Sequence, residues 1–403
     1  RRRLAKVVSA AVGLAVLVAA AVVLLLRWDG GSSPKPQGTA AASAATASST
    51  TARVDPSQPK LAAANPERPG VTIATAKFDL PDPYLFPWGD KYYLYVSTAF
   101  GTPPSMNIPV LVAPRPPNIP RPASANPAAL AHWGPVRDAL PTLPAWARPA
   151  PGTAGRKVWA PDVVRHDGRF LLYFAAAVRN GPSPLSHCLG VATANTPEGP
   201  FVPVPGPPIV CQLALGGDID PQFFVDPNGP EGPAHPYYLI WKSDNNVLPN
   251  LGQDTAWAAP LRNGGLALSG PAVPILTVHQ AWEQPFLEAP QMVKAPNGSY
   301  WLVFSTGSGF WLPGSALGIA QCAGPLGPCR DARTSPLIGS NAQGSGPGEE
   351  TVYVSPTSGV WILYSPWSTG TLAPYRPVEA AHLSWNSQGP ELVAPGLGPI
   401  AAG

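Results

Sequence analysis

Residues 220–243 read DPQFFVDPNGPEGPAHPYYLIWKS, and this stretch holds the pattern that decides the fold. An acidic residue opens a short apolar segment, a turn rich in Pro, Gly and Asn follows, and a strongly apolar, aromatic segment ends the stretch. Aromatic and β-branched residues favour strands, whereas Gly, Pro and Asn mark turns. The stretch therefore predicts two antiparallel strands with a carboxylate at the start of the first.

The same pattern occurs five times after residue 70. The second apolar segments of the five copies begin at residues 92, 170, 237, 300 and 360, so the repeat is 60–78 residues long. A repeat of this length accommodates a four-stranded blade, and blades in a ring protect their sheet edges. We therefore predict an all-β fold, a five-bladed β-propeller over residues 71–403. A β-sandwich with similar hairpins is the weaker alternative, because it does not explain five copies in register.

The first seventy residues have a different composition. Four basic residues precede an apolar run over residues 7–26, which in a helix spans about 30 Å, the thickness of a bilayer core. Residues 1–29 are expected to form a transmembrane helix, a signal anchor that holds the propeller outside the cell membrane. A cleaved signal peptide, which would make the protein secreted, is the alternative. Residues 30–70, rich in Ala, Ser, Thr and Pro, predict a flexible, disordered linker.

Charge and cysteine content narrow the classes of function. Residues 1–35 hold six Lys/Arg and one Asp, which leaves 20 basic and 22 acidic residues in the rest of the chain. Because that part has no run of Lys or Arg, nucleic acid is not expected as a partner. The four cysteines form no CxxC motif. Among the three pairings that they allow, proximity favours the disulfides Cys188–Cys211 and Cys322–Cys329.

Acidic residues recur where the first strand of each repeat begins. They are Asp82, Asp162, Asp220, Glu288, and Glu349 or Glu350. The first strand of each propeller blade lines the central channel, so these side chains are expected to converge on the axis. Carboxylates in partial burial repel one another and their pKa values move apart, as general acid and base catalysis of glycoside cleavage requires. An Asp before Pro also caps turns, which is the alternative for Asp162 and Asp226.

Several short motifs follow one another in a fixed order between Phe78 and Trp385. They are Asp82-Pro-Tyr, Val158-Trp-Ala-Pro-Asp162, His187-Cys-Leu-Gly-Val-Ala-Thr, Gly199-Pro-Phe201, Asp218-Ile-Asp220-Pro, Trp282-Glu283 with Glu288-Ala-Pro, Gly346-Pro-Gly348, and Arg376 before Leu383-Ser-Trp385. In this order and spacing they resemble glycoside hydrolase family 43, the five-bladed arabinofuranosidases and xylosidases.

The resemblance implies roles for the carboxylates that match its motifs. Asp82 would be the general base and Glu288 the general acid, while Asp220 would raise the pKa of that acid. Glu283 is the competing candidate for the acid; Glu288 is preferred because it abuts the strand-opening Ala-Pro. The family inverts the anomeric configuration, so water must fit between base and acid at a carboxyl separation of about 6.5–9.5 Å.

Four further residues are expected to bind the substrate: Asp162, Trp159, Phe86 and Arg376. Trp159 and Phe86 are plausible stacking platforms for a sugar ring, although core packing is the alternative for both. Arg376 matches an arginine that lines the sugar site in the family, and a surface cation is the alternative for it.

One departure from the family concerns a metal ion. Members often carry a histidine after the blade-five Pro-Gly, and another in the next strand, and the histidine helps to hold a metal in the channel. Here these positions read Glu349-Glu350 and Tyr364-Ser365-Pro366-Trp367. A carboxylate can replace imidazole as a ligand of Ca²⁺. Both Ca²⁺ in the central channel and no metal remain open, and no metal ligand or certain cofactor is assigned.

The predicted function is the hydrolysis of arabinofuranosidic or related pentosidic linkages in oligo- or polysaccharides, by a monomeric protein with an inverting general acid/base mechanism. A non-catalytic carbohydrate-binding propeller is one alternative, because the blade-five histidine is missing. A retaining, fructan-cleaving hydrolase is the other. Its Asn-Asp-Pro and Arg-Asp-Pro motifs read Pro81-Asp82-Pro83 and Ile219-Asp220-Pro221 here, which argues against it.

Overall fold

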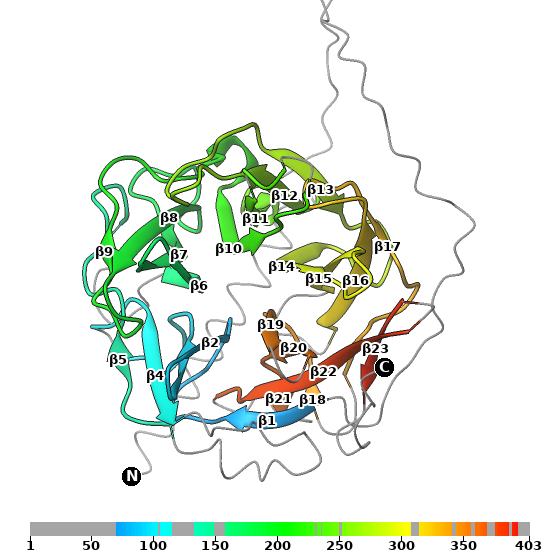
Figure 1. Ribbon diagram of the computed structural model, residues 1–403, viewed down its shortest axis with the longest axis horizontal. Coiled ribbons are helices and arrows are strands. Elements are labelled where there is room, and N and C mark those ends of the chain that lie inside the picture. The colour runs from blue at the N-terminus through cyan, green and yellow to red at the C-terminus, as the bar shows by residue number, and fades with distance from the viewer. Residues whose placement is uncertain are drawn as a thin grey trace, which may run out of the picture. The chain divides into compact units, whose positions relative to one another are not determined.

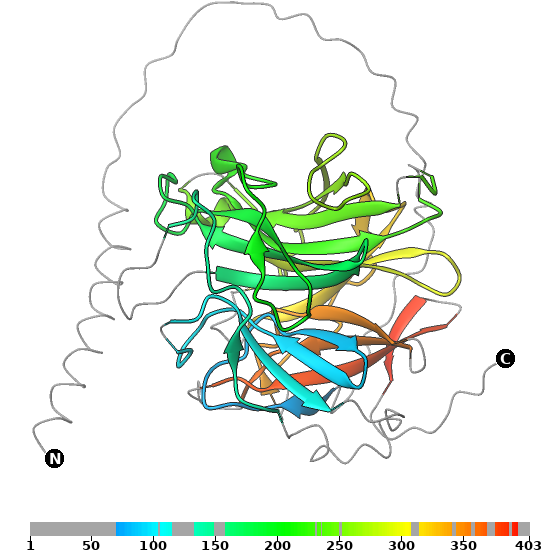
Figure 2. The same ribbon diagram turned by 60° about the vertical axis from the view of Figure 1, so that its left-hand side comes forward.

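Five antiparallel sheets surround a central axis in the part of the chain that the structure describes (Figure 1). The structure is a computed structural model. It describes residues 70–103, 105–114, 133–148, 158–229, 232–234, 236–249, 252–307, 314–340, 344–355, 359–368, 375–386 and 389–393. From blue to red along the chain, the sheets follow one another around the ring (Figure 1), and Figure 2 shows the same sheets from another side.

Four of these sheets each consist of four strands in chain order. Blade one holds β2 (Tyr84–Trp88), β3 (Lys91–Tyr95), β4 (Pro109–Pro114) and β5 (Arg137–Asp138). Blade two holds β6 (Val158–His166), β7 (Arg169–Ala177), β8 (His187–Ala194) and β9 (Val202–Pro203). Blade three holds β10 (Asp218–Val225), β11 (Tyr237–Ser243), β12 (Thr255–Pro260) and β13 (Val273–Thr277). Blade four holds β14 (Phe286–Lys294), β15 (Tyr300–Gly307), β16 (Ala316–Cys322) and β17 (Cys329–Asp331).

The fifth blade joins the two ends of the described chain. Its strands are β19 (Thr351–Ser355), β20 (Gly359–Tyr364) and β22 (Val378–Asn386), followed at the outer edge by β1 (Gly70–Ala74) and β23 (Gly389–Val393). Both β1 and β23 pair antiparallel with β22. Shorter elements of the described residues are the ribbon of β18 (Gly344–Ser345) and β21 (Trp367–Ser368) and the 3-10 turns η2 (Leu213–Leu215) and η3 (Asn245–Val247).

The first strand of each blade lies nearest the axis (Figure 1). In space β2 contacts β6, β6 contacts β10, β10 contacts β14, β14 contacts β19, and β19 contacts β2 again. The inner strands therefore form a closed ring. The predicted five-bladed propeller is confirmed.

Each second strand contains an uninterrupted apolar segment because both faces of each blade are covered. Successive side chains of a strand point to opposite faces of the sheet. In β11, Ile240 packs toward blade four and Trp241 toward blade two. In β15, Val303 packs toward blade five and Phe304 toward blade three. Among the described residues, the five apolar clusters each fill one gap between neighbouring blades.

Both predicted disulfides are present in the structure. Cys322 and Cys329 are paired residues of β16 and β17, so their bond joins the two outermost strands of blade four. Cys188 of β8 is bonded to Cys211, next to the backbone bridge between Leu189 and Val210.

The predicted N-terminal segments lie outside the described residues. This holds for the transmembrane helix over residues 1–29 and for the linker over residues 30–70, except that Gly70 is the first residue of β1. In the region that the structure describes, no helix is long and apolar enough to cross a membrane. The anchor and the linker thus stay predictions.

The closing strand β1 should be important for stability. Ile73 is buried in the cluster between blades five and one. We expect Ile73→Ala to lower the free energy of unfolding by about 2–5 kcal/mol, because it removes buried methyl groups and leaves a cavity. Urea unfolding of the purified protein measures this. The control is Val354→Ala on β19, where the side chain is exposed and the change should stay within about 0.5 kcal/mol. Equal effects of the two substitutions would contradict the importance of β1.

Candidate active site

The five inner strands share one backbone feature at their start. Asp82, Ala160, Asp220, Ala289 and Glu349 have φ values of 50°, 49°, 57°, 48° and 55°. This left-handed conformation is uncommon outside glycine and often marks functional sites. In blades two, three and four the strand register also shifts at this point. Such a bulge redirects side chains, and three of the five equivalent positions carry a carboxylate.

Glu288 lies one residue before the equivalent position of blade four, and blade three holds its backbone on both sides. Ala289 N donates a 2.7 Å hydrogen bond to Asp220 Oδ2. On the other side, Leu287 N donates a 3.4 Å hydrogen bond to Asp254 Oδ2. The Glu288 side chain is 19% exposed, and its Oε1 is 3.5 Å from Lys242 Nζ. Two carboxylates and one cation of blade three therefore set the position of Glu288.

This environment moves the pKa of both carboxyl groups upward. Burial raises the pKa of Glu288 to about 8, where Lys242 opposes the shift and Asp220 adds to it. Burial also raises the pKa of Asp220 to about 6, again with Lys242 opposing. Glu288 therefore keeps its proton at neutral pH, which suits a proton donor.

Asp82 occupies the equivalent position in blade one and remains partly accessible. Ser97 Oγ donates a hydrogen bond to Asp82 Oδ2 and accepts one of 2.7 Å from Ala160 N in blade two. Burial raises the pKa of Asp82, and the nearby charges of Glu349 and Asp220 add to this rise. Ser97 and Arg376 act in the opposite direction and favour the ionised form. The carboxylates of blades one, three and five are thus close enough to perturb one another.

Arg376 is buried beside these carboxylates, with 2% of its surface exposed. Its Nε and Nη2 donate hydrogen bonds of 3.0 and 2.7 Å to the two oxygens of Asp79, and its Nη1 donates one of 2.6 Å to Glu349. The guanidinium also lies 4.9 Å from the ring centroid of Trp367. The alternative of a surface cation is therefore wrong for Arg376, and the residue joins blade five to the segment before blade one.

The two acidic residues of blade five differ as ligands for a metal ion in the channel. The Glu349 carboxylate is already paired with the cation of Arg376, whereas Oε1 of the buried Glu350 has no hydrogen-bond partner in the described part of the chain. Among the residues that the structure describes, the His, Cys, Asp and Glu side chains with metal-type spacing lie elsewhere, at the outer strands.

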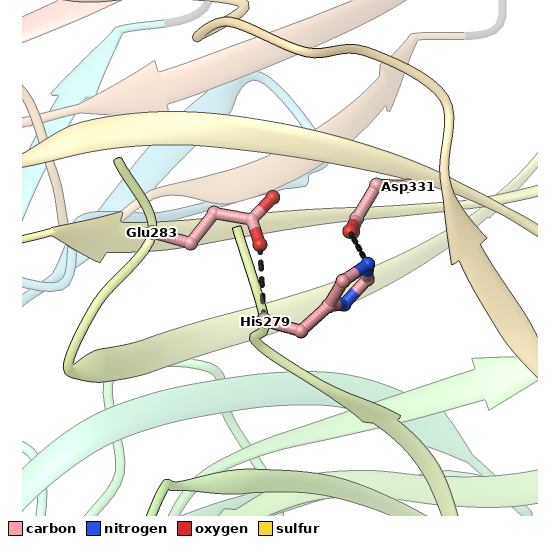
Figure 3. Close-up of side chains that lie close together, drawn as sticks. All are labelled: His279, Glu283 and Asp331. Atoms are coloured by element: carbon pink, nitrogen blue, oxygen red, sulfur yellow. Dashed lines mark hydrogen bonds and ion pairs between the residues drawn. The ribbon is translucent and has the colours of Figure 1, made fainter. Parts of the chain in front are cut away.

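That outer cluster consists of His279, Glu283 and Asp331 (Figure 3). Glu283 is fully buried, and its Oε2 accepts hydrogen bonds from the backbone N–H groups of His279 and Gln280 at 3.2 and 3.0 Å. His279 Nε2 lies 3.3 Å from Asp331 Oδ2 beside a cavity of about 760 Å³. Glu283 thus anchors the loop before β14, and this position favours Glu288 over Glu283 as the acid.

Asp162 lies two residues beyond the left-handed position of blade two and is 2% exposed. Its Oδ2 accepts a 3.3 Å hydrogen bond from Phe223 N in blade three. Residues at the same position in other blades also bond the next inner strand: Gln222 bonds Met292, and Thr351 bonds Pro83. This burial argues against a direct contact between Asp162 and a sugar, and indicates that the residue links two blades.

The two predicted aromatic platforms differ in their surroundings. Trp159 occupies the position in blade two that Glu288 occupies in blade four, and its half-buried ring stacks on His187 at a centroid distance of 4.0 Å. Phe86 lies further along its strand and packs edge-on against Phe170, at 5.9 Å, in the cluster between blades one and two. Trp159 therefore lies at the start of its inner strand, as Glu288 does in blade four, whereas the packing of Phe86 is that of a core residue.

Four charged residues of the site were not identified by the sequence analysis: Asp79, Lys242, Asp244 and Asp254. Lys242 could have been identified from the sequence, since it is a charged residue directly after the apolar segment Tyr237–Trp241. Asp79 and Asp254 lie in connections between strands, where acidic residues are common. Their contacts with Arg376 and Lys242 depend on the fold.

The Arg376 network should matter for stability as well as for the site. We expect Arg376→Met to lower the free energy of unfolding by about 3–5 kcal/mol, because it leaves the buried charges of Asp79 and Glu349 without a counter-ion. Urea unfolding measures the change. The control Arg137→Met removes an ion pair with Glu198 whose arginine is 62% exposed, and it should cost about 0–1 kcal/mol. A loss no larger than the control's would contradict this account of Arg376.

Two curated relatives share part of the sequence. The chain is 29% identical to "Xylosidase/arabinosidase 43A" of Humicola insolens over 191 residues, which is 39% of this chain and 53% of the relative. It is 27% identical to "Beta-D-galactofuranosidase xynD" of Aspergillus niger over 227 residues, 53% of this chain and 58% of the relative. The matches thus span little more than half the length of these relatives.

A solved structure and a family model match a larger part of the chain. The crystal structure of a thermostable family-43 glycoside hydrolase superimposes with a TM-score of 0.60 over 81% of this chain and 97% of the other, at 20% identity. This likeness supports the fold. The model of the family "Glycosyl hydrolases family 43" matches residues 72–390. The chain therefore belongs to glycoside hydrolase family 43.

Proposed function

We propose that this chain is an inverting glycoside hydrolase that cleaves arabinofuranosidic or related pentosidic linkages in oligo- and polysaccharides. In this proposal Asp82 is the general base, Glu288 the general acid and Asp220 the residue that modulates the acid. The observation that carries the proposal is the position of Glu288: its carboxyl group is partly accessible, its pKa is raised to about 8, and Asp220 holds the next residue of the backbone.

The proposed reaction uses the two carboxyl groups in opposite senses. Glu288 donates its proton to the glycosidic oxygen, and the bond from the anomeric carbon to that oxygen breaks with its electron pair on the oxygen. Asp82 takes a proton from water, whose oxygen forms the new bond on the opposite face of the sugar. One water is consumed for each bond cleaved. Proton exchange with solvent then returns Asp82 to the carboxylate and Glu288 to the acid.

The names of the relatives guide the choice of substrate. One relative is named a xylosidase/arabinosidase and another a galactofuranosidase. Pentosides are proposed as the substrates here, and a galactofuranoside belongs in the test. Within the proposed sugar site, the half-buried Trp159 is the candidate stacking platform, and Arg376 sets the position of Glu349 and the charge near Asp82.

The proposed location is outside the cell, attached to the membrane by residues 1–29, with the protein monomeric. Two features support this location: the basic and apolar pattern of the N-terminal residues and the two disulfides of the propeller, since disulfides persist in oxidising compartments.

The first experiment is a hydrolysis assay with aryl α-L-arabinofuranoside, β-D-xyloside and β-D-galactofuranoside and with arabinan, in which proton NMR follows the anomer released. Release of a pentose with inverted configuration supports the proposal. Retention would point to a glycosyl-enzyme intermediate and contradict the roles given to Asp82 and Glu288. Folded protein that binds arabinan without cleaving it would favour the carbohydrate-binding alternative.

Substitution of the two carboxyl groups should have different signatures. We expect Glu288→Gln to abolish hydrolysis of substrates with poor leaving groups while substrate binding is largely kept, because the glutamine cannot donate the proton. Asp82→Asn should abolish hydrolysis of every substrate, because water is then not activated. The measurement is kcat/KM on aryl glycosides with leaving groups of increasing pKa. Near-normal activity of either variant would contradict the catalytic role proposed for the residue that it replaces.

Asp220 should set the alkaline side of the pH profile. A general acid works while it is protonated, so activity should fall as pH rises through the pKa of Glu288, about 8. Because the charge of Asp220 raises that pKa, Asp220→Asn should move the alkaline limb of kcat/KM to lower pH. The control is Asp226→Asn, which alters another Asp-Pro pair whose carboxylate bonds Lys294 and Tyr300. An alkaline limb unchanged by Asp220→Asn would contradict this role.

A further inference from the structure

One position of the repeat carries an unusual side chain in blade three. The residue that follows the five-residue apolar segment of the second strand is Ser97, Ala175, Ser305 and Ser365 in the other blades. In blade three this residue is Lys242. A long cationic side chain thus replaces a small one at a single equivalent position of the ring.

The small residues show what this position does in the fold. Ser97 Oγ accepts a hydrogen bond from Ala160 N at the start of the next inner strand, and Ser305 Oγ accepts one from Glu349 N. Ser365 Oγ donates a hydrogen bond to Leu80 O in blade one. The position therefore reaches across to the beginning of the inner strand of the next blade. For blade three, that beginning contains Glu288.

Lys242 makes the equivalent contact with the start of β14 through ion pairs. It is fully buried, and its Nζ lies 3.1 Å from both Asp254 Oδ2 and Asp244 Oδ1 and 3.5 Å from Glu288 Oε1. Asp254 Oδ2 also accepts the hydrogen bond from Leu287 N. The side chain of Lys242 and the backbone before Glu288 are therefore fixed by the same carboxylate oxygen.

Lys242 carries its charge in this environment. Burial lowers the pKa of Lys242, but the carboxylates of Asp254, Glu288, Asp244 and Asp220 outweigh burial and hold it above its usual value. The groups that face Glu288 are Lys242, Asp220, Asp254 and Asp244 from blade three and Glu350 from blade five. Lys242 is the cation within this set.

We propose that Lys242 is a positioning residue for the general acid, which it orients for proton donation and whose carboxylate it stabilises after the proton has left. This inference rests on the proposed function. The charges around the acid support this role, because the transfer of the proton to the glycosidic oxygen leaves Glu288 negative among several other acidic groups. Lys242 remains protonated throughout, and no bond to it forms or breaks.

The test compares Lys242→Met, which removes the charge, with Lys242→Arg, which keeps it. Removal of the cation raises the pKa of Glu288, so the alkaline limb of kcat/KM for Lys242→Met should move to higher pH by about 1–3 units. The acid also becomes weaker. Hydrolysis of poor leaving groups should therefore lose part of the ~10²–10⁴-fold that acid catalysis supplies, while aryl glycosides with very acidic leaving groups are largely unaffected. Lys242→Arg should restore the limb toward that of the unaltered protein.

The matched control is Lys294→Met. Lys294 is at the other end of β14, the strand that carries Glu288, and its Nζ is 2.7 Å from Asp226 Oδ1. This variant should leave both the alkaline limb and the dependence on the leaving group unchanged. If Lys242→Met keeps them unchanged as well, the inference is wrong although the hydrolase proposal stands. If the unaltered protein cleaves no glycoside, the proposed function itself fails.

A second variant separates an effect on catalysis from an effect on folding. Lys242→Met leaves Asp244 and Asp254 without their counter-ion, which can destabilise the blade. The double variant Lys242→Met/Asp254→Asn removes one buried charge of each sign while the asparagine keeps an acceptor for Leu287 N. The Asp254 charge also raises the pKa of Glu288, so the double variant is compared with Asp254→Asn alone. The double variant should fold, its alkaline limb should lie at higher pH than that of Asp254→Asn, and it should hydrolyse poor leaving groups more slowly. Equal limbs and equal activities of these two folded variants would overturn the inference.

Discussion

Each blade of this propeller can cover its two faces only with its neighbours, and this constraint determines most of the structure. A sheet buried on both sides needs a continuous run of apolar residues in its central strands, as in β7, β11 and β15. An open row of five blades would leave two such faces in water. The pairing of β1 with β22 completes blade five, and the apolar cluster between blades five and one then forms.

The closed ring also explains how the candidate site is built. The start of every inner strand is brought to the same end of the ring and held by the blade before it. Ser97 holds Ala160 N, Asp220 holds Ala289 N and Ser305 holds Glu349 N. In these three cases a side chain near the site also fixes the backbone at the start of the next inner strand. The burial that follows raises the pKa values of Asp82, Glu288 and Glu349.

The order of the elements and the main carboxylates could be predicted from the sequence because they repeat. Five apolar segments in register predicted five blades, and acidic residues at the same point of each copy predicted that Asp82, Asp220 and Glu349 or Glu350 lie near the axis. The proximity of the cysteines predicted both disulfides. These features depend on residues close together in the chain or related by the repeat.

Contacts between different blades could not be predicted in this way. Asp162 is of a residue type, and at a repeat position, expected for a site residue. Its hydrogen bond with Phe223 N depends on the packing of blade three beside blade two, which the sequence does not show. Phe86 is likewise of a residue type that can stack on a sugar ring, but its ring packs against Phe170 of the next blade. The ion pair of Arg376 with Asp79 joins residues of ordinary types whose proximity depends on the ring. The ion pair of Lys242 with Asp254 lies within blade three and depends on the pairing of β11 with β12.

The arrangement of β1 and β23 has a consequence for the connectivity of the chain. Val393, the last residue of β23, pairs with His382, and Gly70, the first residue of β1, pairs with Ala381. Both strands run antiparallel to β22, so β23 leads directly into β1 along one edge. Since His382 and Ala381 are adjacent, a direct peptide bond from Val393 to Gly70 would make them a single strand. The ring is therefore suited to circular permutation, in which the chain is cut open at a surface loop of another blade and the blades keep their order around the axis.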